Sequence, residues 1–329
     1  MSVPVRRVLT LPTVVLLGAV AAGTTAWGLI SSRDSIDSDV YLFASTGSRM
    51  LSGDWLHTFH DSVVQAGPLE LALTSVARSV GPGRAGFAIV LDLVCMAVVT
   101  AAAAWFLGGS ITGLVAFCAG AFALWLPGQG YAGHPAELLI PVLWMVAAAQ
   151  ARGGRLALTG SLVGASGCLE LWGVLGIAVL ALAPDLRRCP RGIAIAIGLP
   201  VASLLPFALG GDFHMFEYEW RTYVGLFALL QRGQPFTWYD RIVEGAIVVA
   251  VGCVVARATR RARESVWIVP TAVAFVRLAL DPVRNDYYWD VPLVLLVIGA
   301  AGLLADRAEL KARLSRRFAA SIPPSAIKS

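Results

Sequence analysis

The sequence predicts an all-α, polytopic membrane protein, and two features of its composition support that prediction. Apolar residues make up 57% of the chain and charged residues only 14%, with a mean hydropathy of +0.72. A soluble domain of this length needs more charge to cover its surface, so the apolar excess must face lipid. At about 20 residues per span plus a short turn, the 329 residues allow roughly ten transmembrane helices.

The chain is organised as a single integral membrane domain over residues 1–329. Its first apolar run, 8–30, follows a basic start and is long enough to cross a bilayer, whereas the apolar core of a secretory signal has only about 7–15 residues. We therefore expect an uncleaved first span. An outer loop (31–67), the remaining helical bundle (68–305) and a basic cytoplasmic tail (306–329) follow it.

Further apolar runs mark the helices of the bundle. They cover residues 86–107, 111–127, 135–150, 156–183, 192–209, 241–256, 265–281 and 290–305. The segment Pro68–Val80, with 13 residues, is too short to cross a hydrocarbon core about 30 Å thick, so we expect a half-span. Arginines flank both ends of the run 156–183, which favours a hairpin turning near 167–170, with Glu170 and Trp172 below the outer surface.

Positive charge lies beside the apolar runs rather than on one continuous surface. Arginine clusters occur at 6–7, 152–155, 187–191, 257–263 and 307–317. Such flanks are typical of cytoplasmic loops, so both termini are expected inside, and a nucleic-acid partner is not expected. Arginine outnumbers lysine 24 to 2, as in GC-rich bacterial genomes, which predicts a bacterial plasma membrane. The five cysteines are scattered, without the spacing of a metal site or a disulfide framework.

The outer loop after the first span has helical periodicity. Val40, Phe43, Gly47, Met50 and Leu51 recur at helical spacing, which predicts amphipathic surface helices. Acidic residues, aromatic residues and all four histidines of the chain also gather in the predicted outer loops or at their edges. This distribution indicates an outward-facing site, although outer loops are polar for topological reasons as well.

Three short motifs in this loop resemble the GT-C glycosyltransferases, membrane enzymes that use polyprenyl-phosphate sugars. They read Asp37-Ser38-Asp39-Val40-Tyr41, Gly53-Asp54-Trp55 and Gly67-Pro68-Leu69, and are most similar to the actinobacterial mannosyltransferase-like branch. The resemblance continues in order through Gly133-His134-Pro135-Ala136-Glu137, Trp172-Gly173-Val174-Leu175 and the Arg277 segment before Tyr287-Tyr288. The family often has a basic residue shortly before the Trp-Gly element, where this chain has Leu169-Glu170-Leu171, and that departure argues against a phosphate site at this turn.

The resemblance implies a GT-C-like fold and an inverting hexosyltransferase without a cofactor. It would move a hexose such as mannose from a polyprenyl-phosphate donor to a glycolipid or glycan acceptor on the outer face. Asp37 matches the family's catalytic carboxylate and Asp39 is the alternative; a helix N-cap is the other interpretation of both residues. Such a transfer needs a carboxylate to take the acceptor proton and positive charge for the departing phosphate.

Arg284 is the first candidate for the donor phosphate and Arg277 the second. A cation at the outer end of an apolar run is costly unless it is paired. For Arg277, the alternative to phosphate binding is a structural ion pair with Asp281 or Glu170.

Other polar and aromatic residues on the outer side complete the candidate substrate-binding set. They are His57, His60, His134, Glu137, Glu170, Tyr287 and Tyr288. The tyrosines could stack on a sugar or belong to an interfacial aromatic belt. Helix capping and hydrogen bonding in a pocket are the main interpretation of these histidines and Glu137, and a divalent metal site is the alternative.

Two other functions remain open at this stage. A transporter or flippase of lipid-linked intermediates would use the outer acids to line a translocation path, and a GT-C-like scaffold could lack activity. A transferase concentrates its polar residues at one face of the membrane, whereas a transporter needs a polar path that its substrate can enter from both faces. Buried polar residues near the inner face are few, which favours the transferase. The partners expected are the lipid-linked donor, the acceptor and membrane lipids.

The charge pattern makes a testable prediction about topology. The loops 31–66, 210–240 and 282–289 should lie outside, because the basic clusters hold the opposite loops in the cytoplasm. Single cysteines introduced at Ser35 and Thr237, in a background without the native cysteines, should react with an impermeant maleimide added to whole cells. Labelling at either position only after the cells are opened would contradict the predicted orientation.

Overall fold

The structure, a computed structural model, describes residues 39–321 except 133 and 284. The predicted first span at 8–30 and the candidate residues Asp37 and Arg284 lie outside the described residues.

The described chain is almost entirely helical, which confirms the all-α prediction. Its one sheet is a short antiparallel pair, β1 with β2, in which Trp220 pairs with Phe236. The elements, in order, are α2 (Asp39–Met50), η1 (Trp55–His57), α3 (Pro68–Val80), α4 (Gly83–Phe106), α5 (Ile111–Ala123), α6 (Gln129–Ala132), α7 (Pro135–Arg152), α8 (Leu156–Leu169), η2 (Leu171–Leu182), η3 (Leu186–Arg188), α9 (Cys189–Gly210), η4 (Met215–Glu217), β1 (Trp220–Arg221), α10 (Ala228–Gln231), β2 (Pro235–Phe236), α11 (Trp238–Thr259), α12 (Ser265–Leu280), η5 (Asp286–Trp289) and α13 (Asp290–Ser321).

Four of the described helical segments are long and apolar enough to cross a membrane. They cover Gly83–Phe106, Leu186–Gly210, Trp238–Thr259 and Asp286–Ala312. Shorter apolar helices cover Ile111–Ala123, Leu156–Leu169, Leu171–Leu182 and Ser265–Leu280. Large apolar side chains such as Ile111 (75% exposed) and Val254 (69% exposed) point out of the bundle, as expected of a surface in contact with lipid. The count of ten crossings stays a prediction.

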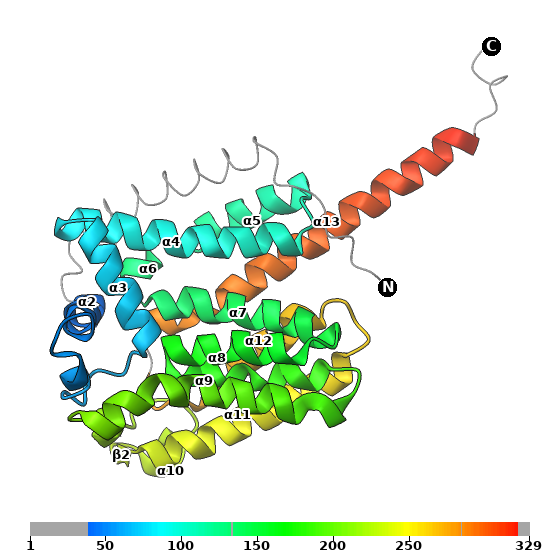
Figure 1. The fold of residues 1–329 in the computed structure, drawn as a ribbon. Coiled ribbons are helices and arrows are strands. Elements are labelled where there is room, and N and C mark those ends of the chain that lie inside the picture. Colours follow the sequence, from blue (N-terminus) through cyan, green and yellow to red (C-terminus); the bar gives the residue numbers. More distant parts are fainter. Residues whose placement is uncertain (1–38, 133, 284, 322–329) are drawn as a thin grey trace.

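The helices form a bundle in which α7, α8 and α12 lie centrally (Figure 1). Helix α8 packs against α7 and α9, and α11 packs against α12 and η2. Helix α4 packs on the other side of α7, α5 packs on α13, and α13 also contacts α7 and α12. Helices α2 and α3 lie at one end of the bundle, and that end holds the candidate site.

The predicted hairpin within 156–183 is present. Helix α8 ends at Leu169, Glu170 adopts an extended conformation, and a 3₁₀ helix, η2, packs back against α8. A 3₁₀ helix rises about 2.0 Å per residue against about 1.5 Å in an α-helix. The 12 residues of η2 therefore reach about as far as the 14 residues of α8.

The predicted surface helix and half-span coincide with α2 and α3. Val40, Phe43 and Gly47 of α2 are buried, in agreement with the predicted apolar face, although Leu51 is 60% exposed. A Cβ at Gly47 would overlap the backbone carbonyl of Leu71, so the glycine allows α2 to lie directly on α3.

Local sequence explains where the helices at the site begin. Both α3 and α7 have proline in their first turn, where the missing N–H costs no hydrogen bond. Helix α11 begins with a capping box, in which Thr237 and Asp240 satisfy each other's backbone N–H groups. These signals place the first turns of all three helices at the end of the bundle that holds the site.

Close packing of α8 on α9 predicts the effect of adding a methyl group. A Cβ at Gly160 would overlap the backbone carbonyl of Gly192, whereas a Cβ at Gly198 has open space around it. Small residues at such crossings let membrane helices approach each other. Gly160→Ala should therefore lower the free energy of unfolding by about 1–3 kcal/mol, because overpacking forces the backbones apart.

Gly198→Ala is the matched control, because it adds the same methyl group to an open helix position. Denaturation in detergent micelles should show it at least as stable as the wild type. Equal stability of the two variants would mean that α8 and α9 are not closely packed at Gly160.

Candidate functional site

Five polar and aromatic side chains meet at the end of the bundle next to α2 and α3, and we call them the His134 cluster. They are Asp39 at the start of α2, Glu70 in the first turn of α3, His134 at the N-cap of α7, Glu170 at the α8–η2 break, and Tyr287 in η5. Five separate elements therefore contribute to one site.

His134 is the centre of this cluster. Its Nδ1 lies 2.9 Å from Oε1 of Glu170, and its Nε2 lies 3.3 Å from Oδ2 of Asp39. The ring stacks on Tyr287 with 4.6 Å between centroids, and Phe43 meets it edge-on at 5.0 Å. The imidazole is therefore held by two aromatic rings and, at both nitrogens, by carboxylates.

The two carboxylates differ in their exposure. The side chain of Asp39 is 60% exposed, while that of Glu170 is 12% exposed. Oε2 of Glu170 also accepts a hydrogen bond from the indole Nε1 of Trp172. The Asp39–His134–Glu170 chain thus leads from the surface into the protein.

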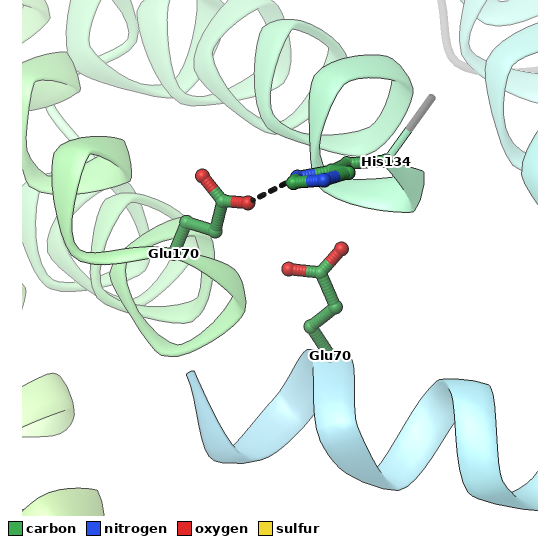
Figure 2. A group of neighbouring side chains, drawn as sticks. All are labelled: Glu70, His134 and Glu170. Atoms are coloured by element: carbon green, nitrogen blue, oxygen red, sulfur yellow. Dashed lines mark hydrogen bonds and ion pairs between the residues drawn. The ribbon is translucent and has the colours of Figure 1, made fainter. Parts of the chain in front are cut away.

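Glu70 brings a third carboxylate to the same histidine. It is fully buried, and its Oε1 accepts a hydrogen bond of 3.3 Å from the backbone N–H of Ala136. This N–H lies in the first turn of α7, where backbone N–H groups have no partner within the helix. Its Oε2 has no hydrogen-bond partner. Ligand atoms of Glu70, His134 and Glu170 lie within 4.8 Å of one another, and the Glu70 carboxylate points toward the gap between the other two (Figure 2).

The carboxylates determine the charge of the histidine. Burial disfavours the charged form of His134, but hydrogen bonds to Asp39 and Glu170 outweigh it and raise the pKa of His134 well above its usual value. The hydrogen bond from His134 in turn lowers the pKa of Asp39, against the smaller opposing effect of burial. Asp39 therefore carries its negative charge at neutral pH.

A second group of charges lies beside the first, and we call it the Arg277 cluster. Asp281 pairs with both Arg241 at 3.2 Å and Arg277 at 3.5 Å, and Arg241 also pairs with Glu244 at 2.8 Å. The guanidinium of Arg277 lies 4.1 Å from the ring centroid of Trp172 and 5.0 Å from that of Tyr288. Such stacking is favourable for a desolvated arginine.

Trp172 joins the two clusters, because its indole N–H donates a hydrogen bond to Glu170 and the face of its ring lies against the guanidinium of Arg277. Glu137, in the first turn of α7, interacts electrostatically with Arg277, Glu170 and His134. Neither of its carboxylate oxygens has a hydrogen-bond partner, and the residue is fully buried.

The structure thus brings together most of the residues that the sequence singled out. Asp39, His134, Glu170 and Tyr287 are in direct contact within the His134 cluster. Arg277 has the structural ion pair with Asp281 that was the alternative to phosphate binding.

His57 and His60 belong to a different group, the Asp212 cluster. Both rings face the carboxylate of Asp212, at 3.1 Å and 3.7 Å, and His60 lies edge-on to His214. Their side chains are 50% and 65% exposed. The metal-ligand geometry found among the described residues therefore joins His134 to Glu70 and Glu170, rather than to Glu137, His57 and His60 as the sequence suggested.

Sequence reasoning missed Glu70, Arg241 and Glu244. Glu70 is the sole acidic residue of the apolar segment 68–80, and a lone carboxylate there was a usable signal. Arg241 and Glu244 stand one turn apart at the start of an apolar run, which is the spacing of a helical ion pair.

Comparison of the chain with protein-family models, curated proteins and solved structures finds no match. Fold and site together define an all-helical protein with helices apolar enough for a membrane and a His–carboxylate cluster at one end of its bundle. The GT-C resemblance stays a prediction.

The Arg277 cluster predicts a large loss of stability when its shared acid is neutralised. Asp281 is 1% exposed and is paired with two arginines. Asp281→Asn should lower the free energy of unfolding by about 3–5 kcal/mol, because it leaves buried positive charge uncompensated.

Asp306→Asn is the control, since Asp306 pairs with Arg263 at 3.2 Å where both side chains are more than half exposed. Solvent screens that pair, so its loss should cost less than about 1 kcal/mol. Denaturation in the same detergent measures both variants, and equal effects would refute a buried network around Asp281.

Proposed function

We propose that this protein is a membrane glycosyltransferase that moves a hexose from a polyprenyl-phosphate donor to a glycolipid or glycan acceptor on the outer face of the plasma membrane. The observation that carries the proposal is the Asp39 carboxylate, which is held by a buried histidine and open to solvent at the end of a membrane-type helical bundle. The hexose class, with mannose as the first candidate, comes from the sequence resemblance.

The geometry of Asp39 suits a general base. His134 contacts the Oδ2 atom of Asp39, and the Asp39 side chain is largely exposed. Its Oδ1 atom can therefore face an acceptor hydroxyl. In the transfer, the acceptor oxygen attacks the anomeric carbon, the bond from that carbon to the phosphate oxygen breaks, and the hydroxyl proton passes to the carboxylate. His134 would orient the carboxylate, and Glu170 would orient His134. Asp37, two residues earlier, is the second candidate for the base.

The departing phosphate needs positive charge. Arg277 is 5% exposed, paired with Asp281 and covered by Trp172, so it suits a positioning role behind the site better than direct contact with phosphate. Arg284, three residues after Asp281, is the proposed direct partner.

The location of the cluster fits a donor whose tail stays in lipid. Helix α10 lies at the same end of the bundle as α2 and exposes Leu229 and Leu230 by 82% and 85%. Such a strongly apolar tip is suited to the boundary of the hydrocarbon core. We therefore propose that this end faces outward, with about ten spans and both termini in the cytoplasm.

Transport of a lipid-linked intermediate is the alternative, and the core argues against it. The main buried cluster of the bundle is apolar and includes Trp144, Met145, Val269 and Val273. Among the described residues, no chain of buried acids leads through this cluster from the His134 cluster to the opposite end of the bundle.

Transfer assays with single carboxylate variants test the proposal. Purified wild-type protein in detergent should transfer labelled hexose from a polyprenyl-phosphate donor. Replacing the general-base aspartate by asparagine should lower the rate of hexose transfer by a factor of about 10²–10⁴, because an amide cannot accept the proton. Asp39→Asn and Asp37→Asn are each measured, and one of them should show that loss with donor binding retained.

Asp212→Asn is the matched control, because Asp212 is an exposed carboxylate of a separate cluster. It should keep wild-type transfer. Full activity in both Asp37→Asn and Asp39→Asn would exclude the proposed base. A wild type that is inactive with every lipid-linked hexose donor would instead favour transport or a scaffold without activity.

A further inference from the structure

We propose that Glu70, His134 and Glu170 form a binding site for one divalent transition-metal ion, of the Mn²⁺ or Zn²⁺ type. Potential ligand atoms of these three residues lie within 4.8 Å of one another, and all three residues are buried. The inference stands on this geometry and does not depend on the proposed glycosyl transfer.

The arrangement around His134 is that of a metal-binding histidine. In protein metal sites, a ligating histidine binds the ion through one ring nitrogen and donates its other N–H to a carboxylate, which fixes the ring. Here Nδ1 faces Glu170 and Nε2 faces Asp39, while the Glu70 carboxylate points toward the gap between His134 and Glu170 (Figure 2). The ion would take the place of a proton on Nδ1, with Asp39 as the outer partner.

The free oxygen of Glu70 is the second and independent observation. Glu70 is fully buried, its Oε1 is held by the backbone N–H of Ala136, and its Oε2 has no hydrogen-bond partner, although the carboxylate belongs to the group around His134. An unpaired buried carboxylate oxygen is costly, and native proteins retain few of them. A metal ion would satisfy this oxygen.

Charge balance supports an ion rather than a further hydrogen bond. Asp39, Glu70 and Glu170 surround a single imidazole, so the histidine balances at most one of the three carboxylates, and the buried Glu70 must be either protonated or bound to a cation. Like charges at such a distance in a buried site repel strongly. A dication bound to neutral imidazole offsets two of the three negative charges.

The donor set and the distances indicate the class of ion. One imidazole nitrogen with two carboxylates suits Mn²⁺ or Zn²⁺ better than Ca²⁺, which prefers oxygen ligands alone. Around an ion with bonds of about 2.1 Å, neighbouring ligands stand about 3 Å apart in an octahedral site and about 3.4 Å apart in a tetrahedral one. The 2.9 Å between Nδ1 of His134 and Oε1 of Glu170 is close to the octahedral separation, so binding in a tetrahedral site would need these two atoms to move slightly apart.

The ligands are already fixed by neighbouring groups. Trp172 holds the second oxygen of Glu170, and Tyr287 and Phe43 hold the His134 ring. A site whose ligands are ordered beforehand binds with a smaller entropy cost.

Metal titration of the purified full chain tests the inference without any sugar donor. After chelator treatment and removal of any polyhistidine tag, the wild type should bind one equivalent of Mn²⁺ or Zn²⁺ per chain, with a higher Tm. Mn²⁺ is measured by the loss of its free EPR signal and Zn²⁺ by competition with a chromophoric chelator. Ca²⁺ should bind more weakly than either. A wild type that binds no Mn²⁺ or Zn²⁺ at micromolar concentrations would overturn the proposal.

Glu70→Gln identifies the site. The amide oxygen can still accept from Ala136, but the charged ligand is lost, so the affinity should fall by at least about 100-fold, more than loss of an outer partner costs. Glu170→Gln should lower the affinity to the same extent, and it replaces Glu70→Gln as the test if that variant does not fold. His57→Ala combined with Asp212→Asn is the matched control, because it removes an exposed His–carboxylate cluster and should leave the affinity unchanged. Binding that survives Glu70→Gln and Glu170→Gln but is lost in this control would show adventitious surface binding and would sink the inference.

Because these measurements use no sugar donor, they separate the two proposals. A protein that binds the ion but transfers no hexose would retain the metal site and lose the transferase proposal. A protein that transfers hexose without binding an ion would retain the transferase proposal and lose the metal site.

Discussion

The site depends on the docking of the α2–α3 connection onto the α8–η2 turn. The backbone N–H of Gly67 donates to the carbonyl of Leu169 at 2.6 Å, and Ala66 forms an isolated antiparallel bridge with Glu170. A Cβ at Gly67 would overlap the backbone of Cys168, so this close approach requires glycine. Helix α3 begins at the next residue, Pro68, and Glu70 in its first turn is thereby carried to Glu170 and His134. Together with the packing of α3 on α4 and α8, this contact fixes the Glu70 carboxylate relative to the bundle.

The two charged clusters at this end of the bundle solve the same physical problem in different ways. In the Arg277 cluster, buried acids are balanced by two arginines, whose planar groups also stack on Trp172, Tyr288 and Trp220. In the His134 cluster, three carboxylates share one histidine, and the balance is incomplete. A structural network needs internal balance, whereas an excess of one sign suits a ligand of the opposite sign. This contrast is why the His134 cluster carries the functional proposals.

Local patterns were sufficient for the helices. Apolar runs and the arginines flanking 156–183 located most of these elements to within a few residues, although α13 continues to Ser321, past the predicted end at 305. The amphipathic pattern of α2 also predicted which side is buried, because a helix repeats every 3.6 residues whatever it packs against. The α8–η2 break was predictable because arginines flank both ends of the run 156–183, and the positive-inside rule favours placing both flanks on the same side of a membrane.

Which polar residues meet was less predictable, because that depends on contacts between segments far apart in the chain. His134 and Glu170 are separated by 36 residues, and His134 and Asp39 by 95. Sequence alone established an all-helical, membrane-type chain with its histidines and many acids grouped in a few loops, since composition and periodicity are local properties. Only the tertiary structure separated His57 and His60 from His134, added Glu70, and assigned Arg277 to Asp281. The reason is geometric, since glycine contacts such as Gly47 on Leu71 and Gly67 on Cys168 determine how α2 and α3 dock, and neither contact can be read from spacing along the chain.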